Sequence, residues 1–122
     1  METTYFLDTY ALIEILNKNK NYEPYRKGSF ITTRFNLMEL HYYLLRNTGK
    51  GDADFYYDYF LRIIVDISDK IIKQANEFKL INKKRKLSYV DCIGYTVSGM
   101  NGAKFLTGDK QFKDMENVEF VK

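Results

Sequence analysis

The sequence contains few of the residues that support disulfide, zinc or imidazole chemistry. Cys92 is the one cysteine and His41 the one histidine among 122 residues. A single cysteine cannot form an internal disulfide, which favours a reducing, intracellular environment. A structural zinc site uses several thiolate and imidazole ligands, so these counts argue against one.

Long apolar runs and tryptophan are also missing, and Pro24 is the one proline. No apolar stretch approaches the roughly 18 residues that a membrane-spanning helix needs. The first residues lack the basic segment and apolar core of a secretory leader. We therefore expect a cytoplasmic protein without membrane association, and the length predicts a single domain over residues 1–122.

Aromatic residues are abundant, because 11 tyrosines and 9 phenylalanines make up 16% of the chain. Tyrosine is favoured at interfaces that are partly wet, so the excess indicates contact surfaces as well as core. The net charge of +3 is compatible with a polyanionic partner but does not require one.

Four carboxylates lie within or directly after apolar segments. They are Asp8, Glu39, Asp91 and Asp109. No lysine or arginine adjoins the first three, and a charge in apolar surroundings is costly unless something compensates it. Carboxylate and hydroxyl oxygens suit hard cations. The sequence therefore predicts metal-dependent chemistry with Mg²⁺ or Mn²⁺.

Short apolar strands alternate with helices, which predicts an α/β fold: a three-layer α/β/α sandwich around a central parallel sheet of four or five strands. The expected strands are 4–7, 29–32, 63–66, 104–106 and 118–121. The expected helices are 10–17, 33–46, 52–61, 68–82 and 88–100, with shorter helical pieces at 22–27 and 109–112. Because ligands bind beyond the carboxyl ends of such strands, the four acids are expected at one edge of the sheet.

Each acid also has a purely structural explanation. Asp8 and Asp109 are suitable helix N-caps. Asp91 can favour the positive end of its helix, and Glu39 can lie at a helix edge. Four acids at topologically related positions nevertheless favour a common site.

Four segments that carry the acids occur in a fixed order along the chain. They are Phe6-Leu7-Asp8-Thr9, Asn36-Leu37-Met38-Glu39-Leu40, Leu87-Ser88-Tyr89-Val90-Asp91-Cys92 and Phe105-Leu106-Thr107-Gly108-Asp109-Lys110-Gln111-Phe112. This ordered set resembles a PIN-domain ribonuclease, most of all the VapC-type toxins of toxin–antitoxin pairs. The resemblance covers essentially the whole chain.

The resemblance implies a metal-dependent endoribonuclease that hydrolyses RNA, pairs with a cognate antitoxin protein and forms a homodimer. It gives the four acids the role of binding Mg²⁺ or Mn²⁺. It gives Thr107 the role of forming a hydrogen bond within the acidic cluster. Asp114 would add an outer carboxylate. The family often has serine or asparagine two residues after its first aspartate, whereas this chain has Tyr10, so a small polar support is missing.

Other segments have two explanations each. The basic run Lys83-Lys84-Arg85-Lys86 precedes the Asp91 helix and is either an RNA-phosphate contact or a solvated loop. Residues 55–60 are too aromatic for an exposed helix, and in the resembling family this region helps form the antitoxin groove. Gly94 and Ser98, on the Asp91 helix, leave room for a backbone, an ion or a substrate.

Two other functions compete with the nuclease. The first is a catalytically silent module of the same fold that binds RNA or protein. The second is a phospho-acceptor receiver domain, which needs an acidic pair after its first strand and a late lysine. Asp8 stands alone at that edge and Glu39 has no role in such a domain, so the receiver reading is disfavoured.

Overall fold

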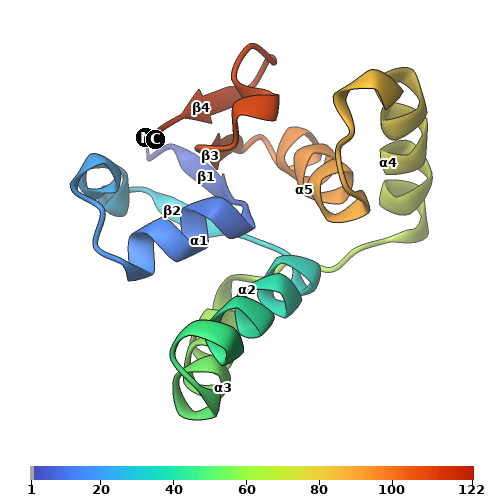
Figure 1. The fold of residues 1–122 in the computed structure, drawn as a ribbon. Coiled ribbons are helices and arrows are strands. Elements are labelled where there is room, and N and C mark those ends of the chain that lie inside the picture. Colours follow the sequence, from blue (N-terminus) through green and yellow to red (C-terminus); the bar gives the residue numbers. More distant parts are fainter. Residues whose placement is uncertain (1) are drawn as a thin grey trace.

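The computed structural model describes residues 2–122 and has a four-stranded parallel sheet at its centre (Figure 1). The strands lie in the order β2-β1-β3-β4. Their bounds are β1 (Thr4–Leu7), β2 (Ser29–Ile31), β3 (Lys104–Thr107) and β4 (Val118–Phe120). The central strands β1 and β3 pair in parallel, with Leu7 opposite Leu106. Their carboxyl ends therefore lie side by side.

Five α-helices and four 3₁₀ segments connect the strands within residues 2–122. The helices are α1 (Thr9–Leu16), α2 (Arg34–Asn47), α3 (Lys50–Phe60), α4 (Asp69–Ile81) and α5 (Tyr89–Met100). The 3₁₀ segments are η1 (Lys20–Lys27), η2 (Leu61–Ile63), η3 (Lys83–Arg85) and η4 (Lys110–Phe112). None of the helices described for residues 2–122 has both the length and the apolarity to cross a membrane.

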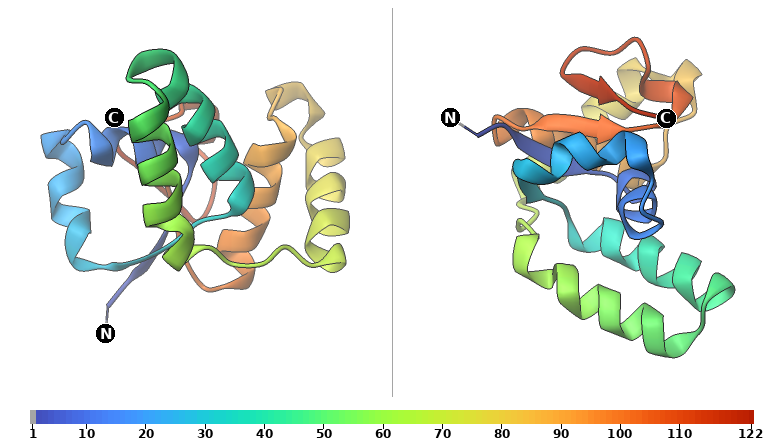
Figure 2. Two further views of the ribbon diagram at one scale, coloured as in Figure 1. Left: turned by 90° about the horizontal axis from the view of Figure 1, so that it is seen from below. Right: turned by 90° about the vertical axis from the view of Figure 1, so that its left-hand side faces the viewer.

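The sheet separates two apolar cores, which confirms the predicted three-layer arrangement. Leu7 and Leu106 on one face belong to the core that contains residues of α1, α2 and α3. Phe6 and Phe105 on the other face pack with α4 and α5, and their stacked rings are 5.5 Å apart. Side chains alternate between the faces of a strand, which explains why neighbours enter different cores. Figure 2 shows the α2–α3 hairpin projecting away from the sheet.

The strand predicted at 63–66 is wrong. The structure has a single parallel bridge there, between Thr32 and Ile64, next to the 3₁₀ turn η2. The backbone of Thr32 accepts a hydrogen bond from Val65 and donates one to Ile63. After this one pairing the chain leaves the sheet edge for α4, so no further ladder forms.

Gly94 opens space for the protein's own core and not for a ligand. A Cβ atom at this position would lie 2.9 Å from Cε1 of Phe6 and 3.4 Å from Cε1 of Phe105. Ser98 is fully buried and donates a hydrogen bond to the carbonyl oxygen of Tyr95. The small residues of α5 therefore let the helix approach the sheet, which corrects the expectation of an open face.

Candidate metal centre

Asp8 lies at the carboxyl end of the central strand β1 and is 5% exposed. Its Oδ1 accepts a hydrogen bond from the backbone N–H of Ala11 at 2.8 Å, so it caps α1. Its Oδ2 accepts one from Oγ1 of Thr107, at the end of β3, at 2.5 Å. Burial, which disfavours the charged form, raises the pKa of Asp8 to about 7 despite these two bonds.

Glu39 reaches the same edge from α2, which begins at its N-cap Thr33. The carboxylate oxygen Oε1 accepts a hydrogen bond from Oγ1 of Thr9 at 2.5 Å. Thr9 in turn accepts one from Nδ2 of Asn36, and Asn36 Oδ1 accepts one from Thr33. Partial burial raises the pKa of Glu39. Hydrogen bonds through Thr9 and Asn36 thus hold the Glu39 carboxylate in position.

Asp91 and Asp109 complete the group, and both also act as structural caps. Asp91 forms a reciprocal capping box with Ser88 at the start of α5, and burial raises its pKa. Asp109 accepts a hydrogen bond from the backbone N–H of Gln111 at the start of η4. Its own N–H donates to Oγ1 of Thr107 at 3.0 Å. Capping and clustering therefore coexist in Asp8, Asp91 and Asp109.

Electrostatic repulsion links the four acids in pairs, and it raises the pKa of Asp91 through Asp109. After burial, repulsion from Asp91 and Asp109 contributes to the raised pKa of Asp8. Repulsion from Asp91 contributes in the same way at Glu39. Within residues 2–122, every ion pair lies elsewhere, at Asp54 and at Asp114. Within residues 2–122 the four carboxyls therefore form no ion pair, although the charge of Lys79 acts to lower the pKa of Asp91.

This donor set suits a hard cation chemically. All four groups are carboxylates, and Mg²⁺ and Mn²⁺ prefer oxygen ligands. In the part of the chain that the structure describes, no three His, Cys, Asp or Glu side chains stand close enough to hold an ion as they are positioned. Binding an ion therefore requires the carboxylates to turn towards a common point.

Thr9 is a polar partner that the sequence pattern did not single out. It lies one residue after Asp8, yet its hydroxyl contacts Glu39, which is 30 residues away. The sequence contains one indication of polar partners for Glu39, because Asn36 is three residues earlier and so shares its helix face. The link to Thr9 depends on the packing of α1 against α2 and could not be read from either segment.

Thr9→Val is expected to weaken Mn²⁺ binding about 10-fold, whereas Thr9→Ser should bind like wild type. Valine keeps the shape but removes the hydroxyl that orients Glu39, and loss of an outer-shell partner typically lowers metal affinity by about 10- to 100-fold. Isothermal titration with Mn²⁺ measures the effect. Equal affinities for the valine and serine variants would contradict this role.

Several predicted contributors lie apart from the acids. Asp114 pairs with Arg85 at 3.0 Å, and that guanidinium also donates to the carbonyl oxygen of Gln111. Asp114 is thus tied to a surface ion pair and not to the cluster. Arg85 is half-buried, whereas the three lysines of the basic run are exposed in and beside η3.

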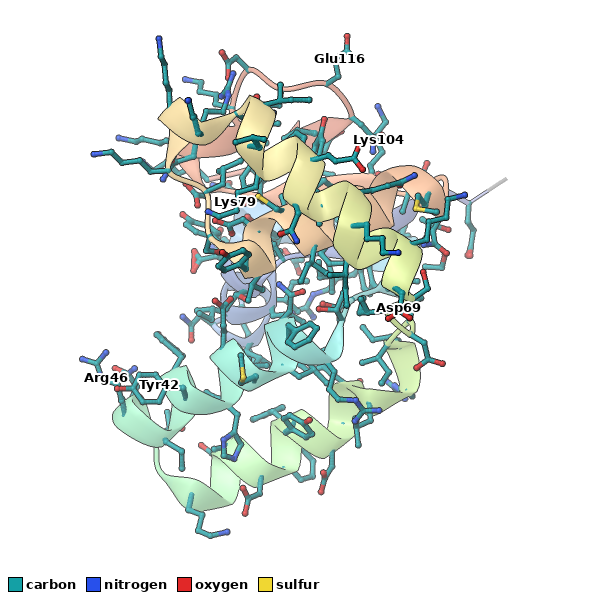
Figure 3. All side chains as sticks on the ribbon, turned by 90° about the vertical axis from the view of Figure 1, so that its right-hand side faces the viewer. Tyr42, Arg46, Asp69, Lys79, Lys104 and Glu116 are labelled. Atoms are coloured by element: carbon teal, nitrogen blue, oxygen red, sulfur yellow. The ribbon has the colours of Figure 1, made fainter. Side chains whose placement is uncertain are left out.

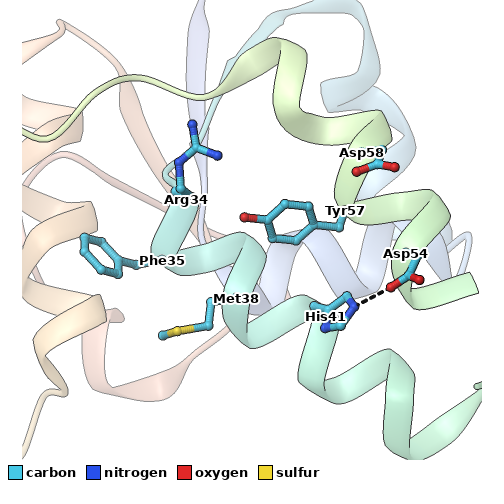
Figure 4. Close-up of a pocket in the computed structure, with 7 residues that line it drawn as sticks. All are labelled: Arg34, Phe35, Met38, His41, Asp54, Tyr57 and Asp58. Carbon is cyan, nitrogen blue, oxygen red and sulfur yellow. Dashed lines mark hydrogen bonds and ion pairs between the residues drawn. The ribbon is translucent and has the colours of Figure 1, made fainter. Parts of the chain in front are cut away.

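A depression of about 530 Å³ on the α2–α3 hairpin contains none of the four acids (Figure 4). It is lined by Arg34, Phe35, Met38, His41, Asp54, Tyr57 and Asp58. His41 Nε2 lies 2.8 Å from Oδ1 of Asp54, and its imidazole packs edge-on against Tyr57. His41 is therefore a packed residue of this hairpin.

The PIN domain family profile matches residues 5–118, and the chain belongs to this family. A search of curated proteins gave no significant match. PIN domains are typically nucleases, and PIN nucleases generally use divalent metals.

Solved structures of VapC toxins share the fold. The chain is 19% identical to Mycobacterium tuberculosis VapC20, described as a sarcin–ricin loop cleaving toxin, with a TM-score of 0.81 over 97% of this chain and 99% of that one. It is 22% identical to a chain of Rickettsia felis VapBC2 bound to a promoter DNA fragment, with a TM-score of 0.73, covering 98% of this chain and 100% of that one. A toxin–antitoxin complex from Klebsiella pneumoniae matches at 16% identity and a TM-score of 0.73, over 94% and 95% of the two chains.

Proposed function

We propose that this protein is a metal-dependent endoribonuclease that hydrolyses RNA phosphodiester bonds as the toxin of a toxin–antitoxin pair. The single observation that supports this most is the buried Asp8 at the carboxyl end of a central strand, which forms no ion pair within residues 2–122 and is repelled by Asp91 and Asp109. Family membership and the RNA-cleaving activity named for VapC20 agree with this assignment.

In this proposal the four acids hold Mg²⁺ or Mn²⁺. When bound, the ion supplies a Lewis acid that makes water more acidic and offsets the charge of the phosphate. Thr107 holds Asp8 in position, and Thr9 holds Glu39. Because its pKa is raised to about 7, Asp8 is about half protonated near neutral pH, and the protonated fraction must release its proton on binding the cation.

Purified wild-type protein is expected to cleave structured RNA in Mn²⁺ and not in EDTA. Glu39→Gln should lower the rate by at least about 100-fold, the scale on which removal of one transition-state-stabilising group acts in enzymes. Glu116→Gln, at an exposed acid far along the chain, is the matched control and should cleave like wild type. Cleavage that is equally fast in Glu39→Gln would contradict the proposal, and RNA binding without cleavage would favour the catalytically silent alternative.

A second copy of this chain is the partner that we propose for α2. Its exposed side has large apolar residues at intervals of three, four and three: Phe35, Met38, Tyr42 and Leu45. This spacing forms one stripe along a helix, the pattern by which two helices pack side by side. Exposed stripes of this kind mark interaction surfaces.

The antitoxin is proposed to occupy a different groove, between α1, η1 and α3. The groove has a volume of about 370 Å³, and its apolar lining includes Ile15, Tyr56 and Tyr59. Three cations border it, at Lys18, Arg26 and Arg62, and none of them is in an ion pair within residues 2–122. Apolar and aromatic anchors next to acidic residues are the complementary chemistry.

Two substitutions separate these surfaces and act as controls for each other. Met38→Asp is expected to convert a dimer into a monomer of 14.5 kDa while still binding the antitoxin. Tyr59→Asp should remain a dimer and bind the antitoxin at least about 10-fold more weakly, because it places a charge in the aromatic groove. Light scattering with and without the protein encoded by the neighbouring reading frame measures both. A monomeric wild type would contradict the dimer surface on α2. Failure of wild type to bind that protein would contradict the antitoxin groove.

A further inference from the structure

A groove between α4, η3 and the start of α5 has no role in the function proposed above. Its volume is about 380 Å³. It is lined by Asn76, Lys79, Leu80, Lys83, Leu87 and Tyr89. The lining thus combines one aromatic ring, two ammonium groups, an amide and two leucine side chains. This composition is unlike the carboxylate-rich edge beside it.

Tyr89 presents an aromatic surface whose position the protein already holds. It is 66% exposed and is the first residue of α5. The ammonium of Lys79 lies 4.9 Å from the centroid of its ring and donates a hydrogen bond to the carbonyl oxygen of Leu87. Figure 3 shows Lys79 on α4, the helix that packs against α5. The ring is therefore ordered before any ligand binds, although it is mostly open to solvent.

The groove borders the acidic site through two of its residues. Tyr89 lies two residues before Asp91 in the same helix. The ammonium of Lys79 donates its hydrogen bond to the carbonyl oxygen of Leu87, directly before Ser88, whose side chain forms the capping box with Asp91. A chain bound at the four acids can therefore continue into this groove.

Lys83 is the member of the basic run that lines the groove. It is exposed, and within residues 2–122 it is in no ion pair. Arg85, two residues further on, is instead engaged by Asp114. Among the four cations of the run, Lys83 lines the groove, Arg85 is held in an ion pair, and Lys84 and Lys86 are exposed outside the groove lining.

We propose that this groove binds one unpaired nucleotide of an RNA strand, with its base stacked on Tyr89 and its phosphate at Lys83. Grooves for single-stranded nucleic acid combine cations along the backbone with aromatic rings under the bases. A base inside a duplex has both faces covered by its neighbours, so this groove favours RNA whose bases are unstacked. The inference rests on RNA being the substrate and adds the region that selects its single-stranded part.

Tyr89→Ala is expected to bind an unpaired oligouridylate of about eight nucleotides, whose bases stack little on one another, roughly 5- to 100-fold more weakly than wild type, the effect of losing one stacked base. Tyr89→Phe keeps the ring and should bind like wild type. Fluorescence anisotropy with Asp8→Asn as the shared background in Mg²⁺ measures binding without cleavage. An RNA duplex of the same length should bind the alanine and tyrosine forms equally.

Lys83→Ala is expected to reduce the slope of log affinity against log salt by about 0.7, the value for one phosphate contact in a single strand. Lys104→Ala is the matched control, because this exposed lysine begins β3 at the opposite edge of the sheet from the acids. The slope for Lys104→Ala should equal that of wild type.

The outcomes separate this inference from the nuclease proposal. If wild type cleaves RNA and the Tyr89→Ala and Lys83→Ala forms bind the oligonucleotide unchanged, the groove assignment is overturned while the nuclease stands. If wild type binds the oligonucleotide through Tyr89 but cleaves no RNA in Mn²⁺, the groove stands and the nuclease proposal fails. No binding of the oligonucleotide by wild type would overturn the groove assignment.

Discussion

Asp8→Asn is expected to stabilise the metal-free protein while removing its Mn²⁺ binding and RNA cleavage. Burial raises the pKa of Asp8 from 3.8 to about 7, so the charged carboxylate destabilises the folded state above that pH. A shift of about three pKa units corresponds to about 4 kcal/mol. The net gain should be smaller, about 1–3 kcal/mol, because an amide has one acceptor oxygen and cannot accept the hydrogen bonds from both Ala11 N–H and Thr107 Oγ1.

The same shift predicts the pH dependence of stability. Between pH 3.8 and about 7 the folded protein binds more protons at Asp8 than the unfolded chain does. The free energy of unfolding of metal-free wild type therefore falls as pH rises through this interval. Raised pKa values at Glu39 and Asp91 act in the same direction. The free energy of unfolding of Asp8→Asn should fall less steeply with pH.

Urea unfolding in EDTA at several pH values measures the stability gain of Asp8→Asn and the pH dependence of stability. Titration with Mn²⁺ measures the loss of metal binding. Glu116→Gln is the control for removal of a carboxylate that is exposed. Mn²⁺ should stabilise wild type and leave Asp8→Asn unchanged, because a ligand stabilises only the state that binds it. If Asp8→Asn is less stable than wild type in EDTA at pH 8, burial of the charge is not what raises this pKa.

Gly108→Ala is expected to destabilise the protein by about 3 kcal/mol, since it overfills a rigid site. A Cβ atom at Gly108 would lie 2.3 Å from Cε1 of Tyr10 and 2.5 Å from the carbonyl oxygen of Val121. For a domain of this size the midpoint of thermal unfolding should fall by about 10 °C. Calorimetry measures it.

Adding Tyr10→Ser to Gly108→Ala should recover part of the loss. Serine removes the ring but leaves the contact with the backbone of Val121, which cannot rotate away. Gly51→Ala is the matched control, because its Cβ would meet nothing within 4 Å and it lies inside α3. That control should raise stability by about 0.5–1 kcal/mol. An unchanged unfolding midpoint in Gly108→Ala would contradict the packing argument.

Tyr10 shows how a local departure from a family pattern is understood only in the fold. From the sequence it is a missing small polar support beside Asp8. In the structure its ring covers Gly108, directly between Thr107 and Asp109. The hydroxyl support of the cluster comes instead from Thr9, one residue earlier, and from Thr107.

The strand that was wrongly expected at 63–66 has a comparable cause. Apolar β-branched residues favour an extended backbone, and Ile64 does pair once with Thr32. Whether a ladder continues depends on where the chain must go next. Here the connection crosses to α4 on the other face, which the local pattern does not reveal.

The sequence by itself determined the alternation of strands and helices, the starts of the helices predicted at 33 and 88, and the placement of Asp8 and Asp109 after the ends of strands. These features follow from local backbone preferences and from side-chain periodicity. Only the tertiary structure decided which groups touch. The bond from Thr107 to Asp8 joins residues 99 apart, and it exists because β1 and β3 are neighbours in the sheet order. The raised pKa of Asp8 likewise depends on burial by the assembled fold, which no short segment can produce alone.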